Sequence, residues 1–319
     1  MLLQINNLSV SFVKEDREFN VVENLNMEVN KSEIIGLVGE SGCGKTSLAF
    51  SIMSLLKKGE GKIRSGEILF NGKNLVNLDE SALSQIRGNK ISYIFQEPFL
   101  YLNPVMTIGR QLAETLMLHK KYSYKQALKV SIQMLQTLGI LDAEEKVNLY
   151  PFELSGGQLQ RVMIAMALGC ESELIIADEP TTALDVSTQK QILDILLSLK
   201  KERGMSILFI SHDLPLVSQF ADRIAIMYCG RIVESGKTET VLSYPKHPYT
   251  KALLHSLELK STWEYIPTIK GEIPNLSNKP EGCYFNSRCD KASEICFKNY
   301  PDKVMIKDEH FATCHHVDH

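Results

Sequence analysis

The sequence predicts an α/β fold with a largely parallel sheet, a helical insertion and a small cysteine-bearing C-terminal tail. Three observations lead to this prediction. Apolar strand-like runs alternate with helix-like stretches, which is typical of a parallel sheet. The stretch from about residue 105 to 170 shows helical spacing instead. Near residue 258 the composition shifts to a linker rich in Pro, Asn and Lys, and four of the seven cysteines follow it.

The elements follow in chain order from hydrophobic periodicity. A buried strand at 33–39 leads into a glycine-rich loop, and a helix is expected from Thr46 to about Leu56. Near the C-terminal end of this pattern, 223–236 is typical of a hairpin. The remaining predicted strands are 2–12, 21–29, 66–72, 91–96, 174–178 and 206–211, and a further helix is predicted at about 187–203.

Composition excludes several classes of protein. The net charge of −3 and the pI of about 6.3 argue against a nucleic-acid-binding surface. No apolar run approaches the roughly 18–20 residues that a membrane span needs. The start, "MLLQINNLSV", lacks the features of a signal peptide. We therefore expect a cytoplasmic protein whose membrane role, if it has one, depends on partners.

The stretch "GESGCGKT" at 39–46 matches the phosphate-binding pattern GxxxxGK(S/T) between a strand and a helix. Small glycines let backbone N–H groups turn toward phosphates, and the helix N-terminus adds a favourable dipole. Lys45 is expected to reach the β- and γ-phosphates of ATP, and the Thr46 hydroxyl to bind Mg²⁺.

Two carboxylates follow the buried run "LIIADEP" at 174–180. Asp178 is expected in the Mg²⁺ shell. Glu179 is not needed as a ligand and is suited to orienting and deprotonating an attacking water, so the pair predicts hydrolysis as well as binding.

A second glycine-rich loop, "ELSGGQLQR" at 153–161, precedes an apolar helical stretch and therefore lies at a helix N-terminus. Because 39–46 already serves the phosphates of this chain's nucleotide, the second loop most simply serves a nucleotide held by another subunit. This arrangement predicts a head-to-tail dimer that encloses ATP.

The combined motifs resemble those of ABC-type ATPases over about residues 1–257. The resemblance implies a P-loop ATPase core with an N-terminal antiparallel β subdomain, a helical insert at about 97–172 and the tail at 258–319. It implies that Gln96 in "FQEP" senses Mg²⁺ and water, that Asp185 in "TTALDV" bridges two sites, and that His212 in "SHDL" contacts the γ-phosphate. The implied catalytic residues are Glu179, Gln96 and His212, and the implied Mg²⁺ ligands are Thr46, Gln96 and Asp178. The implied nucleotide contacts are Gly39, Glu40, Ser41, Gly42, Cys43, Gly44, Lys45, Thr46, Ser47, Asp178, Ser155, Gly156, Gly157, Gln158 and Asp185.

Adenine has two candidate stacking partners, Phe12 in "VSF" and Phe19. A plain core-strand role for Phe12 is equally compatible with the sequence.

Within these ATPases, "YLNPVMTIGRQLAE", "HPYTKALL" and "GCYFNSRC" resemble the oligopeptide and dipeptide importers over nearly the whole chain. Membership implies a similar but distinct ATPase partner, two membrane subunits, an extracytoplasmic solute-binding protein, and a position on the cytoplasmic face of the membrane. Related members import nickel or metal chelates, which is an alternative cargo. A soluble ABC ATPase of DNA repair or translation is an alternative class, but this chain lacks tandem modules, coiled-coil inserts and basic arms.

The tail holds Cys283, Cys289, Cys296 and Cys314. Zinc sites usually show a CxxC-like pair, which is missing, whereas three nearer cysteines and a remote fourth favour an iron–sulfur cluster. The resemblance also points to a [4Fe–4S] cluster. A zinc site and four free thiols are the alternatives. The tail histidines 310, 315, 316 and 319 are substitute ligands or solvated side chains. Cys43 lies inside the phosphate loop, and Cys170 and Cys229 are expected in the core.

Overall fold

The computed structural model describes residues 1–15, 17–181, 184–258, 269–307 and 309–317. Its elements fall into two compact units. Unit 1 comprises Met1–Asn77 and Phe209–His319, and unit 2 comprises Leu78–Leu208. Residue 319 and the first three residues of the predicted linker, which spans 266–282, lie outside the described residues.

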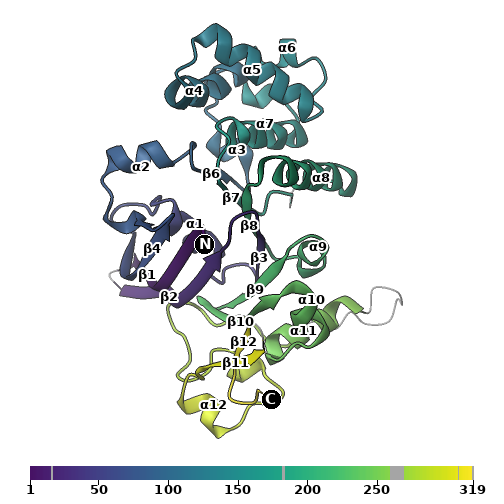
Figure 1. The fold of residues 1–319 in the computed structure, drawn as a ribbon. Helices are drawn as coiled ribbons and strands as arrows, with labels where there is room; N and C mark the ends of the chain where they lie inside the picture. The colour runs from purple at the N-terminus through teal and green to yellow at the C-terminus, as the bar shows by residue number, and fades with distance from the viewer. Residues whose placement is uncertain (16, 182–183, 259–268, 308, 318–319) are drawn as a thin grey trace. The chain divides into compact units, whose positions relative to one another are not determined.

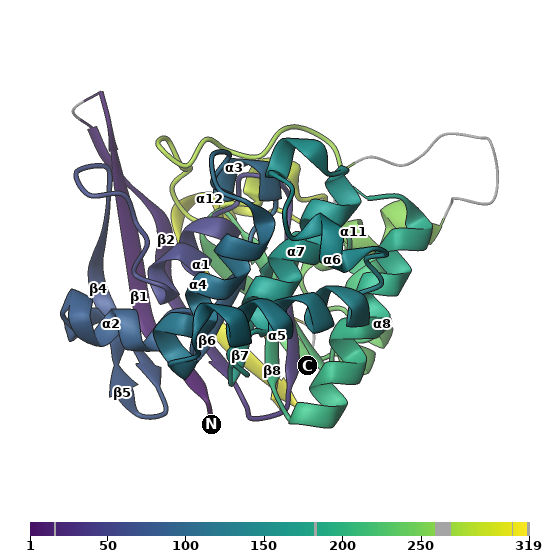
Figure 2. The ribbon, with the colours of Figure 1, turned by 90° about the horizontal axis from the view of Figure 1, so that it is seen from above.

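Unit 1 begins with an antiparallel sheet in the order β2-β1-β4-β5. Its strands are β1 (Leu3–Lys14), β2 (Arg17–Val29), β4 (Gly61–Phe70) and β5 (Lys73–Asn74). Figure 2 shows β1, β2 and β4 side by side, as their registers require. Leu3, Ile5 and Val10 are fully buried, so the apolar alternation that predicted these strands marks one packed face.

A second set of strands in unit 1 runs in the order β11-β12-β10-β9-β3 (Figure 1). It contains β3 (Ile34–Val38), β9 (Arg223–Tyr228), β10 (Arg231–Lys237), β11 (Lys303–Lys307) and β12 (His310–Thr313). The pair β3 and β9 is parallel, and β9 with β10 forms the predicted hairpin. The cysteine-bearing tail extends the same sheet, because β12 pairs with β10. These two tail strands were not predicted from the sequence.

The helices of unit 1 are short. Helix α1 (Lys45–Ile52) ends earlier than predicted, since Ser54 takes a left-handed conformation with φ 51° that stops the helix. The other helical segments of unit 1 are η1 (Leu75–Asn77), α9 (Leu214–Ser218), α10 (Thr238–Ser243), α11 (Pro248–Glu258), η3 (Asn286–Arg288) and α12 (Glu294–Lys298).

Unit 2 contains the helical insertion that the spacing predicted. Its helical segments are α2 (Glu80–Ile86), α3 (Pro98–Tyr101), α4 (Ile108–Lys120), α5 (Tyr124–Thr137), α6 (Ala143–Lys146), η2 (Pro151–Glu153), α7 (Gly156–Leu168) and α8 (Val186–Arg203). A small core of Ala113, Leu116 and Ala127 joins α4 to α5. Strands β6 (Ile91–Ile94) and β7 (Leu174–Asp178) pair in parallel. Strand β8 (Ser206–Ser211) crosses the boundary between the two units.

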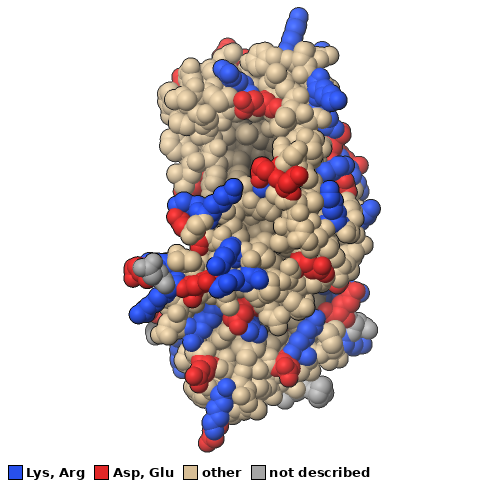
Figure 3. Space-filling view, turned by 90° about the vertical axis from the view of Figure 1, so that its left-hand side faces the viewer, with Lys and Arg blue, Asp and Glu red and all other residues tan. Residues whose placement is uncertain are grey.

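No helix among the described residues is both long and apolar enough for a membrane crossing. Figure 3 shows acidic and basic side chains interspersed on one face, without a field of a single sign. This mixed surface agrees with the small net charge of −3.

Candidate active site

The loop between β3 and α1 has a backbone that only glycine accommodates easily. Gly42 and Gly44 have φ values of 80° and 107°. A Cβ on Gly44 would lie 2.5 Å from the carbonyl oxygen of Val21, and a Cβ on Gly39 would lie 2.3 Å from that of Met227. The predicted loop is therefore formed by close backbone approach and left-handed turns, and it ends at the N-terminus of α1.

Lys45 lies across this loop with only 5% of its surface exposed. Its ammonium donates to the carbonyl oxygens of Gly39, at 2.7 Å, and Glu40, at 3.1 Å. Thr46 is exposed, whereas the Cys43 side chain is fully buried and burial raises the pKa of its thiol. The thiol is therefore not exposed to a ligand, and the backbone N–H of Cys43 donates to the carbonyl oxygen of Glu40 at 3.3 Å.

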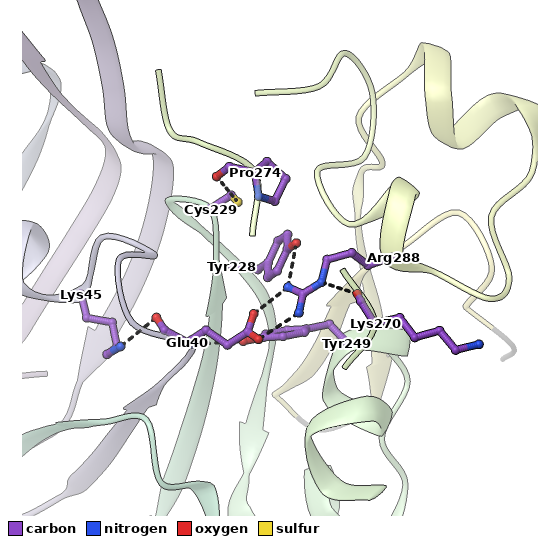
Figure 4. A network of polar contacts seen from close by, with 8 residues as sticks. All are labelled: Glu40, Lys45, Tyr228, Cys229, Tyr249, Lys270, Pro274 and Arg288. Carbon is purple, nitrogen blue, oxygen red and sulfur yellow. Dashed lines mark hydrogen bonds and ion pairs between the residues drawn. The ribbon is translucent and has the colours of Figure 1, made fainter. Parts of the chain in front are cut away.

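Glu40 of the loop has partners that were not predicted from the sequence (Figure 4). Its backbone N–H donates to the hydroxyl of Tyr249, at 3.1 Å, and its carboxylate accepts two hydrogen bonds from the Arg288 guanidinium, at 2.7 and 3.0 Å. Tyr249 belongs to the quoted "HPY" stretch and Arg288 to "GCYFNSRC". Both stretches were recognised in the sequence as family features, but the sequence did not indicate that their side chains contact Glu40.

The "HPY" stretch is the start of α11. The ring of His247 is 1% exposed, and its Nδ1 accepts the backbone N–H of Tyr249 at 3.0 Å, as an N-cap side chain does. Pro248 at the first helical position needs no partner for an N–H. The three residues therefore begin the helix and direct the Tyr249 hydroxyl to the phosphate loop.

In unit 2, the two predicted carboxylates follow each other at the end of β7. Asp178 is 3% exposed and accepts a 2.7 Å hydrogen bond from the hydroxyl of Tyr93 on β6. Glu179 is 7% exposed and has φ 45°, an uncommon backbone value for a residue with a side chain. Gln96 donates from Nε2 to Glu179 at 3.1 Å. The structure thus brings Gln96, Asp178 and Glu179 together and adds Tyr93, which sequence reasoning missed.

The second glycine loop begins α7. Ser155 and Gln158 form a capping box, in which Ser155 N–H donates to Gln158 Oε1 at 3.0 Å. A Cβ added at Gly156 would meet nothing within 4 Å, and one at Gly157 would make only ordinary contacts. Packing within this chain therefore does not require Gly156 to be glycine.

The remaining predicted site residues, Asp185, His212 and Phe12, lie at three different elements. Asp185 caps α8 by accepting from Thr188 N at 2.9 Å. His212 is exposed just after β8, in unit 1. Phe12 faces Phe19 in the β1–β2 pair, and its ring lies 3.0 Å from the place where a Cβ on Gly61 would be.

The four tail cysteines line one cavity of about 10 Å³, together with His316. Four thiols are the ligand set of an iron–sulfur cluster, but this space is about that of a single water molecule. Burial raises the pKa of Cys283 to about 11 and also raises that of Cys289 and Cys314. Over the described part of the chain, no group of three or more His, Cys, Asp or Glu side chains is arranged to hold a metal ion.

The tail histidines differ in their surroundings. His310 is 1% exposed and bonded to Glu234 at 2.8 Å, and His315 contacts the carbonyl oxygen of Asn299 at 2.9 Å. His316 lies against a tail sulfur, with Nε2 3.6 Å from Sγ of Cys296, and both His315 and His316 line the cysteine cavity. Residue 319 lies outside the described part. As expected, Cys170 and Cys229 are core residues.

Comparisons with known proteins cover most of this chain. A family model described as ABC transporter matches residues 22–182, and one described as oligopeptide/dipeptide transporter, C-terminal region, matches residues 233–296. The oligopeptide transport ATP-binding protein AppD of Bacillus subtilis is 42% identical over 98% of this chain and 96% of its own length. The probable peptide ABC transporter ATP-binding protein y4tR of Sinorhizobium fredii is 42% identical over 98% of this chain and 94% of its own length.

Solved structures show the same fold. The dimeric structure of MJ0796, a bacterial ABC transporter cassette, has a TM-score of 0.67 and 28% identity, covering 74% of this chain and 99% of that one. A second structure of MJ0796 is described as a post-hydrolysis state bound to ADP and Pi, with the same score. The chain therefore belongs to the ABC transporter family, as an ATP-hydrolysing ATP-binding subunit of the oligopeptide and dipeptide transport type.

Proposed function

We propose that this chain hydrolyses ATP to drive the import of oligopeptides or dipeptides through membrane partner subunits. The observation that carries the proposal is the similarity over 98% of the chain to proteins named for peptide transport, which includes the C-terminal region. The same machine importing nickel or a metal chelate is the alternative cargo, because this subunit does not itself contact the solute.

The proposed phosphate-binding residues lie in unit 1. Residues 39–47 form the loop that binds the phosphates of ATP through backbone N–H groups other than that of Glu40, which donates to Tyr249. Lys45 neutralises the β- and γ-phosphates by leaving its two loop carbonyls. The exposed Thr46 hydroxyl is suited to Mg²⁺. His212 contacts the γ-phosphate, and Phe12, or Phe19 opposite it on β2, stacks on adenine.

The proposed hydrolytic residues lie in unit 2. Asp178 is a Mg²⁺ ligand, and the hydrogen bond from Tyr93 fixes the orientation of its carboxylate. Glu179 acts on the attacking water as a general base, and Gln96 holds the Glu179 carboxylate in place while sensing Mg²⁺. The strained φ of Glu179 supports this role, because such values are enriched at functional sites.

The second glycine loop acts on the nucleotide of a second ATPase subunit in a head-to-tail dimer. Gly156 supports this proposal, since a side chain there would clash with nothing in this chain. Ser155, Gly157 and Gln158 form the remainder of that contact, and Asp185 bridges the two sites. ATP binding closes the dimer, and hydrolysis reopens it.

The proposed partners are a similar but distinct ATPase subunit, two transmembrane subunits and an extracytoplasmic solute-binding protein. The chain then lies on the cytoplasmic face of the membrane, held there by the transmembrane subunits.

Replacing Glu179 by Gln tests the hydrolytic role. The variant should bind ATP with unchanged affinity, accumulate as an ATP-bound dimer, and lose turnover by about a hundredfold or more. Glu173→Gln is a matched control, because Glu173 precedes the same strand but pairs with Lys90 on the surface. Turnover at the parental rate in Glu179→Gln would contradict the assignment.

Uptake by the reconstituted importer tests the cargo. Vesicles that hold the membrane subunits, both ATPases and the binding protein should accumulate labelled di- and oligopeptides when ATP is supplied. Accumulation of nickel or a chelate, without peptide, would favour the alternative cargo.

We also propose that the four tail cysteines hold a [4Fe–4S] cluster. All four line one small cavity, which supports this, although they would have to rearrange, because the cavity of about 10 Å³ is too small for a cluster and the described side chains form no metal-binding group as they stand. Anaerobic purification followed by iron and zinc assay should give about four iron atoms per chain. Cys289→Ser should lower the iron content, whereas Cys170→Ser, in the core of unit 2, should not. One zinc and no iron would reject the cluster.

A further inference from the structure

Glu40 is bound at three atoms to segments far away in the chain. Its N–H donates to Tyr249 and its two carboxylate oxygens accept from Arg288. Both partners are deeply buried: Tyr249 is 0% exposed and the Arg288 side chain is 3% exposed. A bidentate pair between a guanidinium and a carboxylate fixes geometry as well as charge.

Arg288 is itself held rigidly. Its Nε donates to the carbonyl oxygen of Lys270 at 3.0 Å, and its Nη1 donates to the hydroxyl of Tyr228 at 3.2 Å. In Figure 4 the guanidinium lies between Tyr228 and Glu40, with Tyr249 alongside. These two bonds leave the guanidinium one position, which is set by Lys270 in the tail and by Tyr228 at the end of β9.

The tail segment that carries Arg288 is docked by aromatic packing. The ring of Phe285 lies 5.3 Å from that of Tyr228 and 5.4 Å from that of Tyr249, measured between centroids. Phe285 is 3% exposed. The docked tail therefore determines where Arg288 meets the phosphate loop.

We propose that Arg288 and Tyr249 are positioning residues of the phosphate-binding loop, so that ATP affinity depends on the docked C-terminal tail. Tyr249 takes the N–H of Glu40 and turns that peptide away from the phosphates. Arg288 neutralises the one acidic side chain within the loop, which otherwise repels a triphosphate. Lys45 bonds the carbonyl oxygen of the same residue, so a displaced Glu40 also displaces the lysine that meets ATP.

The inference rests on the proposed binding of ATP by residues 39–47, and the experiment separates the two. The dissociation constant for a fluorescent ATP analogue and the KM and kcat of hydrolysis are measured on the full chain with Mg²⁺. Absence of nucleotide binding by the parent protein would refute the proposed function. Binding by the parent with no change in the variants would refute only this inference.

Three single variants probe the contacts independently. Arg288→Gln and Tyr249→Phe should each weaken ATP binding and raise KM by a factor on the order of ten, with a smaller change in kcat. Arg288→Lys, which keeps the charge but not the bidentate fork, should weaken binding less than Arg288→Gln. If Arg288→Gln does not fold, Arg288→Lys and Tyr249→Phe carry the test, and unchanged affinity in both would overturn the proposal.

A matched control and a double variant distinguish positioning from general destabilisation. Lys279 of the tail pairs with Glu23 at 3.1 Å and is 10% exposed, but it does not contact the loop. Lys279→Gln should leave ATP affinity unchanged. Glu40→Gln combined with Arg288→Gln should bind ATP no more weakly than Arg288→Gln alone, since both act through one bridge. Equal loss in Lys279→Gln, or additive losses in the double variant, would overturn the proposal.

Discussion

Acidification should destabilise unit 1 through His247. Its imidazole is 1% exposed, and burial lowers its pKa to about 4, against the opposing charge of Glu234. Geometry points the same way, because Nδ1 accepts the N–H of Tyr249 and a proton on that nitrogen would remove the acceptor. The folded protein therefore strongly favours the neutral ring.

The expected loss of stability follows from linkage. The pKa of His247 is about 4 in the folded chain, whereas an exposed imidazole titrates with a pKa of 6.5. Between these values the unfolded state binds more protons, so the stabilisation is complete above about pH 6.5 and is lost as the pH falls toward 4. From about pH 7 to about pH 5 the free energy of unfolding should fall by about 2 kcal/mol through this residue alone.

Urea unfolding of the parent and of His247→Asn at the two pH values measures this contribution. Asn at an N-cap accepts the same amide N–H but does not titrate. Glu234 and His310, which face this region, are present in both proteins, so the difference between the two pH slopes isolates His247. The variant should lose about 2 kcal/mol less than the parent. Equal losses in the two proteins would refute the reasoning.

Three further predictions concern a glycine in β3, a glycine in the second loop and the hydrogen bond to Asp178. Gly36→Ala places a Cβ 2.1 Å from Cγ1 of Val217 and should cost about 1–3 kcal/mol in thermal unfolding. Gly156→Ala meets nothing within 4 Å and should not lower stability, yet it should reduce ATPase activity of the assembled dimer; full activity would mean that no ligand approaches this position. Tyr93→Phe removes the hydrogen bond to Asp178 and should raise the Mg²⁺ concentration needed for half-maximal turnover by roughly tenfold, as measured by magnesium titration.

Features encoded by local pattern were predictable from the sequence. The glycine-rich loop at 39–46 between a strand and a helix, the strand that ends at Asp178 and the hairpin over 223–236 each depend on residues adjacent in the chain, and the structure has these elements where they were predicted. The helix that begins at 186 was also predicted to within a residue at both ends. Such features need only periodicity, glycine and a capping side chain.

Features that depend on contacts between distant segments were not predictable. Strand β12 is four residues long, too short for a pattern, and it is a strand because it pairs with β10. Tyr93 appeared as one more apolar residue of a buried strand until its hydroxyl was found against Asp178. Likewise, the charge of Arg288 gave no indication that its partner lay 248 positions earlier in the chain.

The tail shows how a segment poor in apolar residues becomes part of a core. It places the buried ring of Phe285 against the rings of Tyr228 and Tyr249, which precede the tail in the sequence. The polar link to the phosphate loop passes through the same two tyrosines. Burial of Phe285 and the contacts of Glu40 therefore share the same two tyrosines, so undocking the tail would remove partners of the glycine-rich loop as well as burial of the ring.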